Sequence, residues 1–117
     1  ADDAHVAATD IGHAATWVRA AERSPDAVVE ALRTGRSYAS SGPLLHEVHR
    51  ERTTVAVSCS PCRLLVLQME REQGAAVVAR DGGSLITHAE LHAPETSGYV
   101  RLRAVDAAGR SAWSNVL

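Results

Sequence analysis

The stretch Gly35-Arg-Ser-Tyr-Ala-Ser-Ser-Gly-Pro43 divides the chain into two parts with different periodicities. Its first glycine can close a preceding helix, and the small polar residues after it can turn the chain. Ser40 and Ser41 are interpreted as hydrogen-bonding turn residues, because no strand–turn–helix pattern surrounds them as it would a nucleophile. Gly42-Pro43 prevents any further helix. The stretch therefore predicts a junction, with a helix before it and strands after it.

Short apolar segments separated by turn residues follow the junction. We expect strands at Leu44–Arg50, Thr54–Ser58, Leu64–Met69, Ala75–Ala79, Leu85–Ala93, Tyr99–Val105 and Ala112–Val116. The turn signals between them include Asp81-Gly82-Gly83 and Asp106–Gly109, whose last glycine can take a positive φ in a hairpin loop. Short strands at this spacing predict a mainly β protein, an immunoglobulin-like antiparallel β-sandwich preceded by one α-helix.

The inward-facing residues of these strands can be predicted from their alternation. Leu64–Leu67 is apolar on both faces, as a central strand would be. In Tyr99–Val105, Arg101 and Arg103 face outward and the apolar residues between them face inward. The expected core consists of Val55, Val57, Leu65, Leu67, Val100, Leu102 and Trp113.

A helix from Pro25 to Thr34 is predicted by the residues at its ends. Ser24 can cap its N-terminus, Pro25 fits the first helical position, and Gly35 can supply the left-handed residue that ends it. One face of this helix is apolar, formed by Ala27, Val28, Ala31 and Leu32. Before the helix we expect a short strand at Thr16–Ala21.

Size, charge and hydropathy exclude several classes of protein. The 117 residues are enough for a sizeable core. With 12 basic and 14 acidic residues, the net charge of −2 argues against a nucleic-acid or anionic-membrane partner. The apolar run Leu64–Leu67 is far too short to span a membrane. The chain begins at Ala1 and not at Met, which favours a segment of a larger protein; the compartment stays open, with the cytoplasm favoured.

Cys59 and Cys62 form an isolated Cys-Ser-Pro-Cys motif. A redox pair needs a helix N-terminus to lower the thiol pKa, whereas this segment continues into an apolar strand. A structural zinc site needs four ligands, and the chain has no second cysteine pair. We therefore expect a turn between strands with incidental thiols, whose redox state is left open.

Asp3 and His5 are the candidate metal ligands. In an extended segment their side chains share a face with their bases about 6–7 Å apart, so both can reach one metal ion. Asp10 and His13 follow within reach. The alternative is a solvated chain end, which is common for the first residues of a domain.

The remaining histidines are weaker candidates. His88, Glu90 and His92 alternate along one strand, and we interpret them as the solvated face of an antiparallel sheet. A zinc deaminase would need cysteines after His88, and none follows. His46 and His49 lie three residues apart on a strand, hence on opposite faces, and are not expected to share a site.

Three stretches, in this order, resemble one protein family. Asp2-Asp3-Ala4-His5, with Asp10-Ile11-Gly12 and Trp17-Val18, resembles the last metal-binding motif of the polymerase and histidinol phosphatase (PHP) family of metal-dependent phosphoesterases. The segment Ala31–Pro43 resembles the run that follows this motif in one branch of the family. Gly109–Asn115 resembles the end of that branch, where a small β-domain follows the catalytic barrel.

The resemblance implies a C-terminal fragment of a hydrolase that is not catalytically complete alone. Asp3 and His5 would be metal ligands at the end of a barrel strand, for zinc, manganese or iron ions that activate water and polarise a phosphoryl or ester group. The other ligands of the family are absent from the chain. Residues 1–35 would then be a remnant of the barrel, and residues 36–117 an accessory β-sandwich domain. The implied partners are the missing barrel, the phosphoester or ester substrate of the parent, and a second copy of the fragment.

A fibronectin-III-like binding module is the alternative. The last strands of such modules are similar to Tyr99–Val105 and Gly109–Asn115, and residues 1–34 would then be a linker with a capped helix. The Asp-x-His pattern at residues 3–5 discriminates between the two hypotheses, because a freestanding binding module has no use for it. Fold analogy alone assigns no function.

Overall fold

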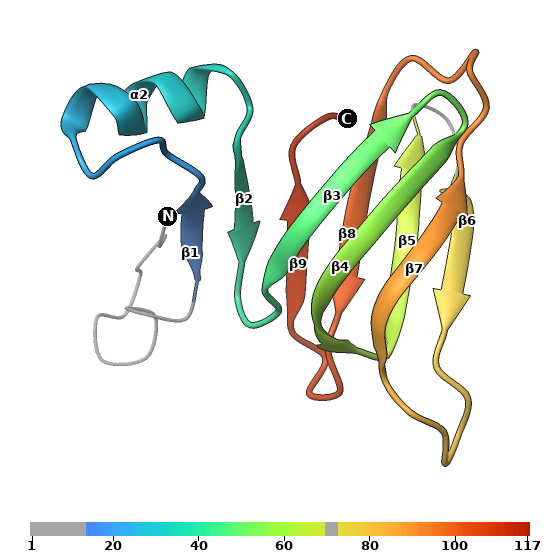
Figure 1. The fold of residues 1–117 in the computed structure, drawn as a ribbon. Helices are drawn as coiled ribbons and strands as arrows, with labels where there is room; N and C mark the ends of the chain where they lie inside the picture. The colour runs from blue at the N-terminus through green and yellow to red at the C-terminus, as the bar shows by residue number, and fades with distance from the viewer. Residues whose placement is uncertain (1–13, 70–72) are drawn as a thin grey trace.

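The computed structural model describes residues 14–69 and 73–117, which form a mainly β structure with one α-helix (Figure 1). The strands are β1 (Ala15–Val18), β2 (Ser37–Ser40), β3 (Leu45–Glu51), β4 (Thr54–Cys62), β5 (Leu64–Met69), β6 (Gln73–Val78), β7 (Ile86–His92), β8 (Val100–Val105) and β9 (Ser111–Ser114), and the helix is α2 (Pro25–Arg33). Every strand pair is antiparallel. The predicted mainly β, antiparallel class is therefore confirmed.

The strands form two sheets of unequal width. The larger has the order β1-β2-β9-β8-β5-β6, and the smaller has the order β3-β4-β7. In Figure 1 the smaller sheet lies in front of the β9, β8, β5 and β6 end of the larger one, whereas β2 and β1 extend past the edge strand β3. The smaller sheet therefore leaves one end of the larger sheet uncovered.

The hydrophobic core lies between the sheets and takes residues from both. Leu65, Leu67 and Leu102 of the larger sheet and Val55 of the smaller are fully buried. The other core members are Leu45, Val57, Cys59, Cys62, Leu91, Ala93, Val100, Ala104 and Ala112. Six of the seven predicted core residues are thus confirmed.

The prediction that Trp113, the seventh of these residues, belongs to the core is wrong. The pairing of β8 with β9 sets Ala104 opposite Ala112, so that Ala112 and Ser114 point inward and are buried. Trp113 alternates with them and faces outward, where the Arg103 guanidinium lies 5.1 Å from its ring centre. The ring is covered by a cation–π contact on the sheet surface and not by the core.

The helix begins and ends where its end signals predict. The Ser24 side chain accepts a hydrogen bond from the Ala27 N–H (3.2 Å), and Gly35 takes a φ of 77° after the last turn. Its apolar face is only partly covered: Ala31 is buried, but Val28 and Leu32 are 37% and 47% exposed. Among the described residues, no helix has the length and hydrophobicity needed to cross a membrane.

The predicted junction contains a strand that the pattern did not indicate. β2 pairs with β1 on one side and with β9 on the other, so the larger sheet continues across the expected boundary between residues 35 and 36. The turn follows it: Ser40 Oγ donates to the Pro43 carbonyl (2.5 Å) and accepts from the Gly42 N–H (3.0 Å). Ser41 Oγ accepts from the Ser111 N–H (3.1 Å) of β9. The Ser40 side chain therefore bonds within the turn, as predicted, although Ser40 itself ends β2, whereas Ser41 bonds across to β9. The division into two domains stays a prediction.

The β8–β9 hairpin is closed by Asp106. Its Oδ1 accepts from the N–H groups of Ala108 (3.0 Å) and Arg110 (2.9 Å), and its Oδ2 accepts from Arg110 Nε (2.8 Å). Burial alone would raise the pKa of this carboxyl, but the hydrogen bonds and charge of Arg110 outweigh it and lower the pKa below its ordinary value. Gly42 packs so closely that a Cβ there would lie 2.7 Å from both Arg110 Nε and Asp106 Oδ2.

Candidate functional site

The metal ligands predicted from the sequence, Asp3 and His5, lie outside the described residues, as do Asp10 and His13. Within residues 14–69 and 73–117, no group of three or more His, Cys, Asp or Glu side chains is arranged to hold a metal ion. Their assignment as metal ligands therefore stays a prediction.

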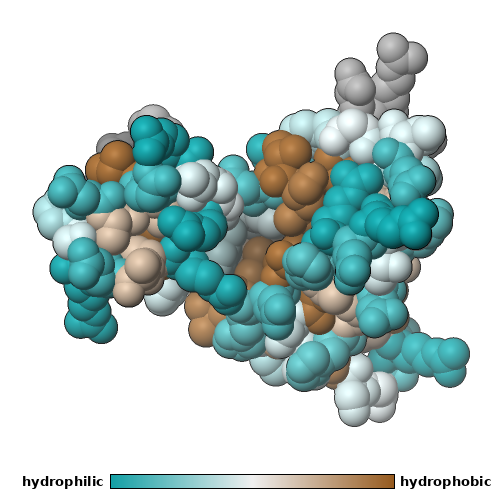
Figure 2. Space-filling view, turned by 45° about the horizontal axis from the view of Figure 1, so that its top comes forward, coloured by the Kyte–Doolittle hydropathy of each residue, from teal (hydrophilic) through white to brown (hydrophobic). Residues whose placement is uncertain are grey.

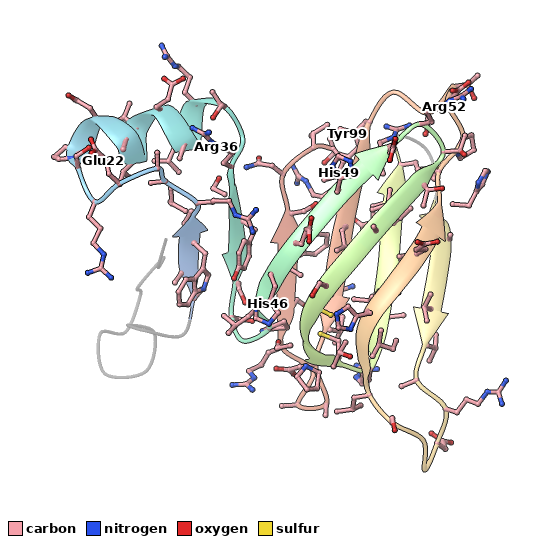
Figure 3. All side chains as sticks on the ribbon, viewed as in Figure 1. Glu22, Arg36, His46, His49, Arg52 and Tyr99 are labelled. Carbon is pink, nitrogen blue, oxygen red and sulfur yellow. The ribbon has the colours of Figure 1, made fainter. Side chains whose placement is uncertain are left out.

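The histidines of the smaller sheet do not converge. His88, Glu90 and His92 are exposed on β7, opposite the small residues of β4, as a solvated sheet face requires. His46 and His49, labelled in Figure 3, line two different hollows of the surface. The interpretation of His88, Glu90 and His92 as a solvated sheet face is confirmed. His46 and His49 were expected on opposite faces of the strand, and both are exposed.

The two cysteines are buried thiols within a strand. β4 continues to Cys62 through an irregular register after Ser58, so the expected turn at this motif is wrong. Cys59 and Cys62 form no disulfide. Burial first, and then the neighbouring Cys59, raise the pKa of Cys62 to about 12, and burial also raises the pKa of Cys59. Neither thiol is a reactive thiolate near neutral pH.

A hollow of about 500 Å³ lies where the larger sheet extends past the smaller one. We call it the N-terminal cleft. It is lined by Trp17, Val18, Arg19, Gly35, Arg36, Ser37, Tyr38, Leu45, His46, Val48, Ser114, Asn115, Val116 and Leu117. Figure 2 shows the molecule hollowed between the N-terminal elements and the sheets, with hydrophobic residues along its floor and one wall.

Two aromatic rings form one wall of the cleft. Trp17 on β1 is the cross-strand partner of Tyr38 on β2, and their rings stack with centroids 6.4 Å apart and planes 15° apart. Tyr38 packs against the core, whereas Trp17 remains 50% exposed. Burial raises the pKa of the Tyr38 hydroxyl, and a hydrogen bond with the Leu45 backbone opposes that increase.

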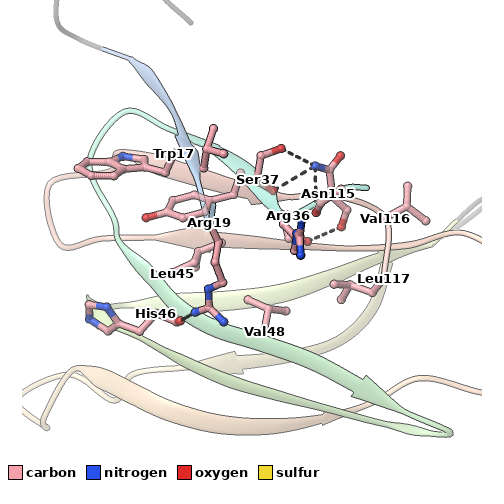
Figure 4. Close-up of a pocket in the computed structure, with 14 residues that line it drawn as sticks. Trp17, Arg19, Arg36, Ser37, Leu45, His46, Val48, Asn115, Val116 and Leu117 are labelled. Atoms are coloured by element: carbon pink, nitrogen blue, oxygen red, sulfur yellow. Dashed lines mark hydrogen bonds between the residues drawn. The ribbon is translucent and has the colours of Figure 1, made fainter. Parts of the chain in front are cut away.

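Two arginines give the cleft its charge. The backbone N–H of Arg19 donates to the Arg36 carbonyl (2.9 Å), which brings the two residues together after β1 and before β2. Arg19 Nη2 donates to the His46 carbonyl on β3, so its side chain bridges the two sheets (Figure 4). Among the described residues that line the cleft, none is Asp or Glu.

Asn115 ties the C-terminal end of the sheet to the residues that open β2. Its Nδ2 donates to Ser37 Oγ (2.8 Å), to the Ser37 carbonyl (3.1 Å) and to the Gly35 carbonyl (3.4 Å), as the dashed lines of Figure 4 show in part. These contacts join residues far apart in the sequence, and the Leu117 N–H bonds the Val100 carbonyl (2.9 Å) beside them. The start of β2 is thereby linked to the residues that follow β9.

Residues 3–37 match the model of a family described as PHP-associated. The match supports a C-terminal portion of a PHP-family protein, as the resemblance implied. It spans β1, α2 and the intervening turns, and it ends at Ser37, the first residue of β2. No curated protein and no solved structure matches the chain.

The sequence did not indicate the cleft. Its polar members come from the residue after β1, from the start of β2 and the residue before it, from β3, and from the end of β9 and the residue after it, and no local motif joins them. The nearest signal in the sequence is Trp17-Val18, which belongs to the expected strand at Thr16–Ala21 and to the PHP resemblance.

Proposed function

We propose that this chain is the C-terminal region of a metal-dependent phosphoesterase of the PHP family, and that its β sheets are an accessory, stabilising domain. The observation that carries the proposal is the PHP-associated match, because it includes both Asp3 and His5. The chain alone is catalytically incomplete, since two ligands do not make up a catalytic metal site.

Asp3 and His5 would hold a metal ion in the parent protein. Carboxylate and imidazole are suitable ligands for zinc, manganese or iron, so the donor chemistry of the pair fits the family's metals. Within the described residues nothing completes the set, and the remaining ligands would come from a barrel outside this chain. The bound metal would activate a water molecule and polarise a phosphoryl or ester group.

The accessory role is supported by the way the PHP-associated segment is attached. β1 is hydrogen-bonded to β2, and β2 to β9, so the segment is continuous with the larger sheet. Asn115 adds three hydrogen bonds to Gly35 and Ser37 at the end of the matched region. We infer that the sheets hold the last metal-binding segment of the parent in position and present no chemistry of their own.

A fibronectin-III-like binding module remains the second candidate, and the strand order is compatible with it. Taking β3, β4 and β7 as strands A, B and E, and β5, β8 and β9 as C, F and G, reproduces the assignment of these strands to the two sheets of an immunoglobulin-like sandwich. This topology fits an accessory domain equally well. The two functions therefore differ in whether the metal-binding pair is needed for hydrolysis.

The experiment compares this chain with the longer protein. Elemental analysis of the chain after dialysis should find less than one metal ion per chain, because two protein ligands bind a metal ion weakly. In the longer protein, Asp3→Ala and His5→Ala should abolish hydrolysis of bis(4-nitrophenyl) phosphate and leave the circular dichroism spectrum unchanged. Asp2→Ala and His88→Ala are the matched controls and should remain active. Normal hydrolysis by both ligand variants would show that the site is assigned wrongly.

A further inference from the structure

We propose that the N-terminal cleft binds a small organic anion, with its apolar body against Trp17 and Tyr38 and its oxyanion head on Arg19 and Arg36. The inference does not use the metal-binding pair, because it is argued only from cleft residues in the described part of the chain.

The size and position of the cleft suit a small ligand. The hollow of about 500 Å³ falls within the range of about 300–1,000 Å³ that is usual for small-molecule sites. It exists because the smaller sheet ends at β3, while β2 and β1 continue the larger sheet beyond it. The face of β1 and β2 that would otherwise be covered by a facing strand is therefore open to a ligand.

The apolar body would lie between the aromatic rings and the aliphatic side chains. Trp17 and Tyr38 form a nearly parallel stacked pair on the β1–β2 side. Val48 and Leu117 line the cleft from β3 and from the end of the chain, and both pack against the core. Because Trp17 is half exposed, a flat apolar group that covers it would remove a large hydrophobic area from water.

The two guanidinium groups determine the charge of the ligand. Arg19 uses one N–H for the His46 carbonyl, which positions its side chain and leaves further donors. Arg36 makes no side-chain hydrogen bond or ion pair with any residue of the described part of the chain. None of the described residues that line the cleft is Asp or Glu, and a carboxylate or phosphate is the group that matches the planar forks of the two arginines.

The test uses probes with one apolar body and different heads. These are 2-naphthoate, 2-naphthyl phosphate and the neutral 2-naphthalenemethanol, titrated into ¹⁵N-labelled protein and followed by NMR. The Trp17 indole N–H should shift saturably, while that of Trp113, on the opposite face of the sheet, should not. Either anion should bind at least about tenfold more tightly than the alcohol, and their ratio shows which head is preferred. Equal affinities for all three probes, or equal shifts of both indoles, would overturn the proposal.

Two variants separate the proposed head site from general charge. Arg36→Gln should weaken binding of the preferred anion at least about tenfold and leave binding of the alcohol unchanged. Arg80→Gln removes the same charge from the exposed loop between β6 and β7 and should change neither affinity. Equal effects of the two substitutions would refute a specific head site. Dispersed amide spectra establish that both variants are folded. Arg36→Lys provides a second variant, which keeps the positive charge but loses the planar fork of the guanidinium.

Discussion

Replacing Leu102 by Ala should remove a large share of the stability of the protein. Leu102 is fully buried on β8, where it pairs with Leu67 of β5. The substitution deletes roughly three buried carbon groups at about 0.8 kcal/mol each, so the lost burial alone is about 2.4 kcal/mol. The cavity that remains raises the expected cost to about 3–5 kcal/mol. The free energy of unfolding of a small domain is about 5–15 kcal/mol, so a loss of this size is readily measured.

Urea denaturation followed by circular dichroism provides the measurement. The midpoint should fall for Leu102→Ala while the slope of the transition stays the same. Leu85→Ala is the matched control, because Leu85 lies just before β7 and is 40% exposed, so that solvent fills the space of the lost side chain. We expect it to cost less than about 1 kcal/mol. Equal losses for the two variants would refute the placement of β8 at the centre of the core.

Three further predictions concern the hairpin and the thiols. Asp106→Asn should destabilise the protein at pH 7, and its difference from the wild type should shrink as the pH falls below about 4, because the lowered pKa of Asp106 stabilises the fold only while the carboxylate is ionised. A difference as large at pH 2 as at pH 7 would contradict this. Gly42→Ala should cost about 1–3 kcal/mol in thermal unfolding because its Cβ would overlap the hairpin, whereas Gly98→Ala, with open space around it, should cost less. Cys59 and Cys62 should react with iodoacetamide much more slowly in the folded than in the urea-unfolded chain, since burial raises the pKa of both; comparable rates would place them at the surface.

The strands of the two-sheet core could be predicted because alternation is a local property. Leu64–Met69 was predicted with the bounds of β5, and the burial of β8 alternates as its sequence does. The helix could be predicted for the same reason, since Ser24, Pro25 and Gly35 act on the residues next to them.

The errors lie where distant residues determine the structure. Small polar residues at 37–41 indicate a turn, but the unpaired edges of β1 and β9 supply backbone partners that make part of them a strand. Trp113 is hydrophobic enough for the core, yet the register with β8 gives that face to Ala112. The cleft forms because Arg19, Asn115 and β3 lie close together in the folded chain. Their positions in the sequence do not indicate this proximity.

The position of β2 between β1 and β9 has a consequence for biosynthesis. A ribosome releases the chain N-terminus first, so residues 37–40 emerge long before residues 111–114. Until β9 has been made, the nascent β2 has β1 beside it but lacks its other neighbour in the sheet, and Ser37 lacks the amide of Asn115. The attachment of β2 to β9 and to Asn115 can therefore be completed only after residues 111–115 have emerged from the ribosome.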